Sequence, residues 1–330
     1  MRAADDPLAR APDAFLRACR LDVETAKPGN VSIASPGHGM DATQFIDSAE
    51  AAAPALFTRG ASVGARILGA VTRTRQVAGC NTNLGIVLLV APLAAALEAA
   101  CEARCEAGCE GACEAGCEAR CEAGCEAGCE AGCEAGCEAA PPDAARWQAC
   151  VGRVLAALTV DDARAAYRAI ALANPGGLGD APEQSVHAPP TVDLRAAMSL
   201  AAGRDSIARQ YANGFADIFG AGLDALAISP RASPAALTLD VFLTFLGTWP
   251  DSHILRKHGA AVAQSVTGEA RERHAQWRRE GDAASAARLD AWDAELKARR
   301  VNPGTSADLT VATLFVAALL DPPRFAAERA

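Results

Sequence analysis

Apolar residues recur along most of this chain at the spacing of an α-helix. Phe15, Cys19 and Val23 mark one face of an opening helix, and a second such face runs from Trp147 to Leu158. A period of 3.6 residues places these positions on one side of a helix, which buries them against other elements. The alternation of β-branched residues that marks strands is scarce. We therefore predict an all-α fold, a single-domain multi-helix bundle.

Further helices are expected wherever this periodicity continues between breaks. The predicted ranges are 51–57, 63–71, 159–173, 194–219, 237–249, 260–279, 283–300 and 308–320. Gly60 separates the first two. Asp161 and Asp162 stand in the first turn of the third, where the helix dipole favours negative charge. Thr305 or Ser306 is the expected N-cap of the last helix.

The most apolar run extends from Leu84 to Leu97 and contains no charged residue. A membrane span needs roughly 20 such residues, so this run is too short, and Pro92 interrupts it. We predict a buried core helix here and no association with a membrane.

A Cys-Glu-Ala-Gly tandem repeat occupies residues 101–138 and contains ten of the 13 cysteines. Cysteines four residues apart advance about 400° on a helix, so the stripe winds around the axis and forms no packed seam. Metal capture by thiolates is one interpretation, but an unbroken Cys-x-x-x-Cys register defines no tetrahedral set. We predict an insert at 99–142, a surface loop or frayed helix, within one catalytic domain formed by residues 1–98 and 143–330.

The charge balance changes once the repeat is set aside. The formal net charge is −9, of which the ten Glu and two Arg of the repeat contribute −8. The rest of the chain has no basic field of the kind that binds nucleic acid. The cysteines outside the repeat are Cys19, Cys80 and Cys150, and the N-terminus has no apolar signal segment. We expect a cytoplasmic protein without disulfides.

One candidate for ligand chemistry is the segment Lys27-Pro28-Gly29-Asn30-Val31, which follows the opening helix. The proline biases Lys27 away from helical geometry, and a glycine lets backbone approach a ligand closely. A lysine in such a loop can meet a phosphate as a point charge. The alternative is a helix C-cap followed by a turn, and local spacing leaves both interpretations open.

Two further loops place polar groups before helices. His38 is flanked by glycines and is followed by Asp41, which suits proton transfer or metal binding but equally suits an N-cap. Asn81, Thr82 and Asn83 precede the apolar run, and a helix N-terminus attracts anions. Three such residues in a row exceed what one cap requires.

Charged residues also gather in the C-terminal half. Asp205 and Arg209 are four residues apart, Asp251 and Arg256 flank a short segment after Pro250, and Asp308 follows a Pro-Gly turn. Each could form an ordinary helix-surface ion pair or cap, and none is decisive alone.

Taken in order, these segments resemble the triphosphoribosyl-dephospho-CoA synthase family. The resemblance covers nearly all of the chain outside the repeat. It rests on residues 27–31, His38 with Met40-Asp41 and Phe45, residues 79–85, 175–179, 197–205 and 207–211, Asp251, His258-Gly259 and residues 303–309.

The resemblance implies an all-α enzyme that joins ATP to 3′-dephospho-CoA. The 2′-hydroxyl of the acceptor would attack C1′ of the ATP ribose, adenine would leave, and the triphosphate would stay attached. The product would be the precursor of the prosthetic group on acyl-carrier subunits of citrate lyase or malonate decarboxylase.

The resemblance also implies which residues form the site. The candidate catalytic carboxylates are Asp41, Asp205, Asp251 and Asp308. Mg²⁺ is expected as the ATP complex, with Asp205 and Asp308 as its protein ligands. The candidate nucleotide and phosphate ligands are Lys27, Gly29, Asn30, His38, Asn81, Thr82, Asn83, Arg209 and Arg256.

The chain departs from the family pattern at residues 30–32, where Leu-Val-Asp is usual, at Ser185, where Asp is usual, and in the loop at 81–85. The prosthetic-group synthases carry Asn-Thr-His-Lys-Gly where this chain has Asn81-Thr82-Asn83-Leu84-Gly85. The variant pattern resembles the branch of the family found in archaea and methyl-oxidising bacteria. Two alternatives therefore stay open: a related ATP-dependent transferase with another phosphorylated acceptor in one-carbon cofactor biosynthesis, and a non-catalytic helical nucleotide-binding protein.

Overall fold

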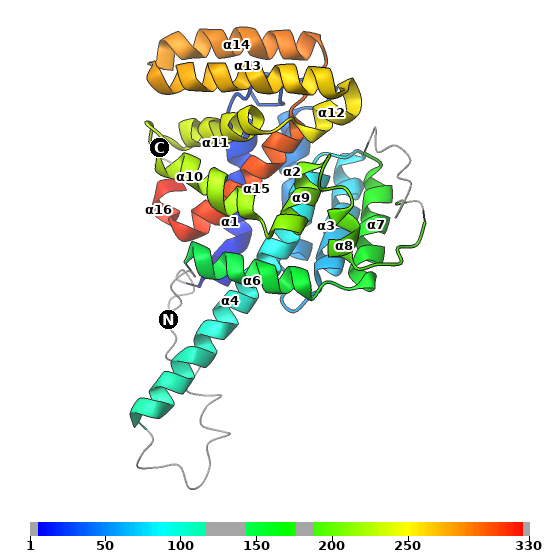
Figure 1. The fold of residues 1–330 in the computed structure, drawn as a ribbon, viewed down its shortest axis with the longest axis vertical. Coiled ribbons are helices and arrows are strands. Elements are labelled where there is room, and N and C mark those ends of the chain that lie inside the picture. The colour runs from blue at the N-terminus through cyan, green and yellow to red at the C-terminus, as the bar shows by residue number, and fades with distance from the viewer. Residues whose placement is uncertain (1–5, 117–142, 176–185, 187, 281, 326–330) are drawn as a thin grey trace.

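The computed structural model describes residues 6–116, 143–175, 186, 188–280 and 282–325. Fifteen α-helices and one π-helical turn make up its regular structure, and the described residues contain no strand. The predicted all-α fold class is confirmed (Figure 1).

The larger of two hydrophobic cores draws on helices from both ends of the chain. Its apolar side chains come mainly from α1 (Pro7–Glu24), α2 (Ala42–Leu56), α3 (Val63–Ala78), α4 (Leu84–Gly116), α6 (Ala144–Ala156), α7 (Val160–Ala173) and α15 (Gly304–Leu320). The C-terminal α15 packs against α1, so the end of the chain lies on its beginning. These helices confirm the predictions made from apolar spacing in the same regions.

Helix α4 is the centre of this core. Val87, Leu89 and Val90 have no exposed surface. The stretch Leu84–Ala103 is the one described helix long and apolar enough to cross a membrane, and 78% of it is buried inside the protein. That environment is the one predicted for a core helix. Pro92 lies within α4, and the helix continues through it.

The smaller core lies under a helical hairpin. It joins α11 (Pro234–Thr248), α12 (Ser252–His258), α13 (Ala260–Arg279) and α14 (Asp282–Ala298) through side chains such as Phe242, Trp277 and Trp292. Figure 1 shows α13 and α14 as an antiparallel layer across α11. Helices α11 and α15 contribute side chains to both cores, which makes the two cores one body.

The prediction of one long helical stretch over 194–219 is wrong. The chain there forms α8 (Leu194–Ser199), α9 (Ser206–Asn213), the π-helical η2 (Ile218–Gly222) and α10 (Leu223–Ala227). Asp205 starts α9 because its carboxylate accepts the amides of Ile207 and Ala208. Gly214 ends α9 because it adopts φ +70°, a left-handed conformation that glycine reaches without strain.

The predicted N-cap of the last long helix is also wrong. Helix α15 begins at Gly304 after Pro303, with no side-chain cap. Ser306 lies inside its first turn and donates instead to Asp251, 2.8 Å away. The short α16 (Pro322–Phe325) follows and buries Phe325.

The repeat begins on an existing helix. Helix α4 runs without a break from the core into the first repeat units and projects from the body (Figure 1). The rest of the repeat, and the predicted loop motif at 176–179, lie outside the described residues.

Candidate active site

A cavity of about 350 Å³ opens where the two cores meet. One side is formed by the N-terminal end of α4, the C-terminal end of α7 and the α8–α9 segment. The other side is formed by α12, the link between α14 and α15, and the first turns of α15. The cavity therefore draws on six helices that are far apart in the sequence.

The wall contributed by the larger core is apolar. Leu84, Leu88, Ile170, Met198 and Ile207 line it. Apolar walls with a few convergent polar groups are typical of cofactor and nucleotide sites. This side suits the flat ring of a base and not a phosphate chain.

The opposite side carries positive charge. Arg204, Lys257 and Arg300 line the cavity with exposed side chains, and none of them has an ion pair within the described part of the chain. Arg256 lines it too and is paired with Asp205. Three uncommitted cations and one paired cation at a single opening match a ligand with several negative charges.

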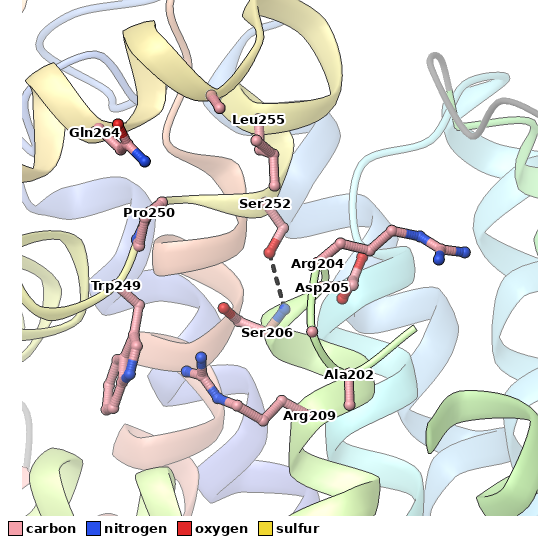
Figure 2. A pocket seen from close by; sticks show the side chains of 12 residues that line it. Ala202, Arg204, Asp205, Ser206, Arg209, Trp249, Pro250, Ser252, Leu255 and Gln264 are labelled. Atoms are coloured by element: carbon pink, nitrogen blue, oxygen red, sulfur yellow. Dashed lines mark hydrogen bonds between the residues drawn. The ribbon is translucent and has the colours of Figure 1, made fainter. Parts of the chain in front are cut away.

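A second, smaller cavity of about 180 Å³ has Arg204 and Asp205 in common with the first. It is lined by the start of α9, the Trp249-Pro250 link, α12 and the start of α13 (Figure 2). Ser206 and Ser252 face each other on its wall, and the Ser206 amide donates to Ser252 Oγ over 2.8 Å.

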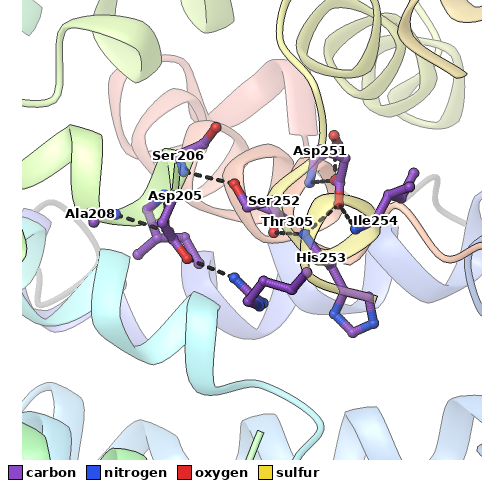
Figure 3. Close-up of polar contacts among 11 residues, drawn as sticks. Asp205, Ser206, Ala208, Asp251, Ser252, His253, Ile254 and Thr305 are labelled. Carbon is purple, nitrogen blue, oxygen red and sulfur yellow. Dashed lines mark hydrogen bonds and ion pairs between the residues drawn. The ribbon is translucent and has the colours of Figure 1, made fainter. Parts of the chain in front are cut away.

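Asp205 stands between the two cavities. Its Oδ1 accepts the amides of Ile207 (2.9 Å) and Ala208 (3.1 Å), which caps α9. Its Oδ2 accepts from Arg256 Nη1 at 2.7 Å, so α9 and α12 are tied together (Figure 3). Both oxygens of this carboxylate are therefore occupied by protein donors.

Asp308 presents the opposite situation. It lies on the first turns of α15 and lines the larger cavity, and it has no hydrogen bond or ion pair to any residue that the structure describes. Burial, and then the neighbouring carboxylates Asp22 and Asp251, raise the pKa of Asp308 well above its usual range. A carboxylate that is held open in a cavity and resists ionisation is suited to exchange a proton near neutral pH.

Gly85 makes room for this carboxylate. A β-carbon at Gly85 would lie 2.6 Å from Asp308 Cγ and 2.7 Å from Ile207 Cδ1. Real β-carbons do not approach other atoms so closely, so α4 and α15 can meet with Asp308 between them only because residue 85 has no side chain.

Asp251 is buried and fully bonded. Its carboxylate caps α12 through the amides of His253 (2.9 Å) and Ile254 (3.1 Å) (Figure 3). It also accepts from both the amide and the hydroxyl of Ser306. It thus fixes α12 against α15. Burial raises the pKa of Asp251, and the donors from Ser306 oppose that rise.

Two histidines line the larger cavity. Burial and nearby Lys257 and Arg256 lower the pKa of His253 to about 3, so its imidazole is neutral at physiological pH. His253 Nε2 is buried and has no partner among the described residues. His38 adopts φ +58° and bonds through Nε2 to the carbonyl of Gly29, 2.8 Å away.

The structure brings five of the predicted site residues to the larger cavity: His38, Asn81, Asp205, Arg256 and Asp308. They come from five segments separated by up to 270 positions, which spacing along the chain could not have grouped. Asn81 also accepts the amide of Leu84 at 3.1 Å, so it combines a capping role with its place in the cavity.

Lys27, which was predicted to contact phosphate, is directed into the protein interior. Its ammonium group is fully buried, 3.1 Å from Asp22 Oδ1, and lies outside both cavities. Burial lowers the pKa of Lys27 and raises that of Asp22, while each group opposes the shift in the other. The physical reason for this position is that Asp22, in the last turn of α1, is buried and needs a counter-charge.

The rest of the Lys27 loop is also held by protein. The Gly29 amide donates to Asp293 Oδ1 at 2.7 Å, and Asn30 Nδ2 donates to Asn302 Oδ1 at 2.9 Å. A β-carbon at Gly29 would lie 2.9 Å from the Val301 carbonyl, so this glycine serves close packing. Neither Gly29 nor Asn30 lines the cavities, although Asn302 does.

Thr82 and Asn83 also turn away from the ligand space. Thr82 Oγ1 donates to Ser48 Oγ at 2.6 Å, and Asn83 Nδ2 donates to the Ser48 carbonyl at 3.3 Å. Both are buried and dock the start of α4 onto α2. The excess of polar residues before α4 is explained by this helix–helix contact.

Asp41 and Arg209 take other places. Asp41 caps α2 by accepting the amides of Thr43 and Gln44, and it lines neither cavity, so the catalytic role predicted for it is not supported. Arg209 lines the smaller cavity, where its Nε donates to Asp217 at 2.8 Å.

Five groups in the larger cavity were not among the predicted site residues: Tyr167, Arg204, His253, Lys257 and Arg300. Arg204 and Lys257 are next in sequence to Asp205 and Arg256, which were predicted site residues, so their position could have indicated them. Tyr167 lies in the middle of α7 and Arg300 follows the end of α14, and no local pattern distinguishes them.

The predicted pair of metal ligands does not form a metal site by itself. No group of three or more potential ligands converges in the described part of the chain, and both oxygens of Asp205 are engaged. Mg²⁺ commonly needs only one or two carboxylates when phosphates supply the other ligands. The residues present thus do not fit a protein-only site, and any ion would rest on the phosphates of a bound nucleotide.

Comparison with known proteins adds two findings. The model of the ATP:dephospho-CoA triphosphoribosyl transferase family matches residues 9–325. Among solved structures, the chain is similar to a crystal structure described as a putative triphosphoribosyl-dephospho-CoA synthase from Archaeoglobus fulgidus, with a TM-score of 0.56 and 19% identity. The match covers 84% of this chain and 98% of that one, and it supports the fold. The search of curated proteins gave no match.

Proposed function

Because the chain belongs to the ATP:dephospho-CoA triphosphoribosyl transferase family, we propose that the larger cavity is the catalytic site of this transfer. The protein is a transferase that moves the triphosphoribosyl group of ATP to dephospho-CoA and releases adenine. The observation that carries the placement of the site is the unbonded carboxylate of Asp308 between an apolar wall and a cationic rim.

The two sides of the cavity match the two ends of ATP. The triphosphate carries about four negative charges near neutral pH and would lie along Arg204, Arg256, Lys257 and Arg300. The base would lie against the apolar wall beside Leu88 and Ile170. This orientation places the ribose of ATP between the two sides, near Asp308.

The reaction breaks the bond from C1′ of the ATP ribose to adenine and forms a bond from C1′ to the acceptor hydroxyl oxygen. The hydroxyl loses one proton and the departing adenine gains one, so the overall transfer is neutral. Asp308 is the carboxylate placed to receive the hydroxyl proton, since Asp205 and Asp251 are held by protein donors.

His253 and the cations have supporting roles in this proposal. A neutral imidazole with an unsatisfied Nε2 can bond a sugar hydroxyl or a ring nitrogen without adding charge. The cations hold the phosphates and so fix C1′ relative to the attacking oxygen. Mg²⁺ would enter as the ATP complex and would neutralise part of the triphosphate charge.

Adenine release tests this function. Purified protein with ATP, Mg²⁺ and dephospho-CoA should release one adenine for each acceptor consumed, with a product heavier by one triphosphoribosyl group. Asp308→Asn should release adenine at the background rate. Wild-type protein that consumes neither substrate under these conditions would contradict the proposal.

A further inference from the structure

The transfer requires two nucleotides at once, yet the larger cavity offers one apolar wall and one set of cations. We propose that the smaller cavity, lined by Arg209 and Trp249, binds the diphosphate of the acceptor; this assignment rests on the proposed function. The two cavities share Arg204 and Asp205 in their walls, so ligands in them would meet at this boundary.

Arg209 is the group that points to a phosphate ligand. Its guanidinium lies over the Trp249 ring, 4.4 Å from the ring centroid, and its Nε donates to Asp217 at 2.8 Å. These two contacts fix the plane and one edge of the group. Figure 2 shows the guanidinium of Arg209 between the Trp249 ring and Ser206.

One of the two remaining nitrogens of Arg209 is unsatisfied. Nη2 is buried and has no hydrogen-bond partner among the described residues. A buried donor without a partner is costly, and a guanidinium edge with two free donors matches two oxygens of a phosphate group. The cavity supplies no protein oxygen to Nη2, so a ligand oxygen is the natural partner.

The charge of each cavity indicates which one binds ATP and which one binds the acceptor. The larger cavity has three cations without an ion pair, which match the higher charge of a triphosphate. The smaller cavity offers Arg209, whose charge Asp217 already balances in part, and neutral Ser206 and Gln264, while Arg204 and Asp205 at the shared boundary have opposite charges. A diphosphate diester carries about two negative charges and no terminal phosphate, so it suits the weaker site.

Size and position agree with this assignment. A volume of about 180 Å³ holds a diphosphate but not a whole dephospho-CoA. The acceptor ribose would then lie at the Arg204–Asp205 boundary, with its hydroxyl directed to the ATP ribose. The pantetheine arm would leave past the exposed Gln264 on α13.

The test separates the two Michaelis constants. Arg209→Met should raise KM for dephospho-CoA about tenfold or more and leave KM for ATP within about twofold. Arg231→Met is the matched control, because Arg231 stacks on Trp277 at 3.9 Å and lines neither of these cavities. It should change neither KM.

A surface variant keeps the test informative if Arg209→Met does not fold. Gln264→Glu adds a negative charge at the mouth and should raise KM for dephospho-CoA about fivefold, whereas Gln264→Lys should lower it. Equal effects on both substrates, or no effect from Arg209→Met and the Gln264 pair, would overturn the assignment. Wild-type protein that releases no adenine would instead refute the proposed function.

Discussion

The Lys27 loop and the larger cavity contain similar residues and use them in opposite ways. In the loop, Lys27, Gly29 and Asn30 each bond a protein partner at 3.1 Å or less. In the cavity, the side chains of Asp308, Arg204, Lys257 and Arg300 form no hydrogen bond or ion pair in the described structure, and Arg256 is paired with Asp205. A cation or an amide beside a glycine in the sequence therefore does not show whether the group is structural or binds a ligand. What separates a structural from a ligand-binding group is whether the fold already satisfies it.

The largest effect is expected at Asp308. Asp308→Asn keeps the shape of the side chain but cannot accept a proton, so kcat should fall by about 10²- to 10⁴-fold. Adenine release measures the loss. Asp41→Asn is the matched control, because asparagine caps a helix as well as aspartate does, and its activity should stay near wild type. Comparable losses in both variants would remove the distinction between the two carboxylates.

The raised pKa of Asp308 predicts the shape of the pH profile. A carboxyl with a raised pKa stays protonated to higher pH, so activity should already fall on the acidic side well above pH 4, where an ordinary carboxyl ionises. The contribution of Asp308 to the free energy of unfolding should change in the opposite direction, falling as pH rises. Wild type must ionise an enclosed group as pH rises, so Asp308→Asn should be the more stable protein at pH 8, with the difference vanishing in acid.

Lys27→Met should act on stability and not on chemistry. It leaves the Asp22 carboxylate buried without its counter-charge, which costs about 3–5 kcal/mol in chemical denaturation. The double variant Lys27→Met/Asp22→Leu should recover most of this loss, since it removes both buried charges. A double variant that folds well yet cannot bind ATP would show that Lys27 contributes to the phosphate site.

Gly85→Ala tests whether α4 must leave space for the Asp308 carboxylate. Alanine favours helix, so α4 itself should gain stability, but its β-carbon would displace the Asp308 carboxylate. Crowding of this kind typically costs about 1–3 kcal/mol, and here we expect about a 10- to 100-fold loss of kcat with the fold retained. Gly152→Ala is the control, since nothing lies within 4 Å of its added β-carbon.

The smallest effects on activity are expected at the exposed cations that line the larger cavity. Replacing Arg204, Lys257 or Arg300 singly by Gln should raise KM for ATP about twofold to fivefold, because each exposed charge contributes about 1 kcal/mol at most. The effect should shrink at high salt, where exposed charges are screened. Gln substitution at Arg59, which pairs with Asp6 away from both cavities, should leave KM unchanged.

The fold was largely predictable because helix formation is encoded locally. The apolar faces of α1, α6 and α13 repeat every three to four residues, and such spacing needs no tertiary information. The prediction failed between α8 and α10, where Asp205 and Gly214 divide the chain. A cap at Asp205 was considered, but the break that such a cap makes in the helix was not placed there.

The site was predictable only in part, because its residues are joined by tertiary contacts. Asp205, Arg256 and Asp308 carried enough charge near loops to be chosen. Lys27, Thr82 and Asn83 carried the same signal and were chosen for the same reason, but their partners, Asp22 and Ser48, satisfy them inside the protein. No local pattern tells whether a polar side chain has such a partner. Arg300 is the opposite case, because nothing in the sequence selected it, yet it lines the cavity without an ion pair in the described structure.

Helix α4 begins at the cavity and ends among the repeats, and this continuity sets how changes in repeat number propagate. Starting a helix is slow and unfavourable, whereas lengthening one costs little per residue. The core has already nucleated α4 at Leu84, so added or lost units act at the distal end, away from Gly85 and Asp308. Length variation in this segment is therefore decoupled from the geometry of the cavity, which allows the repeat to drift while the chemistry is maintained.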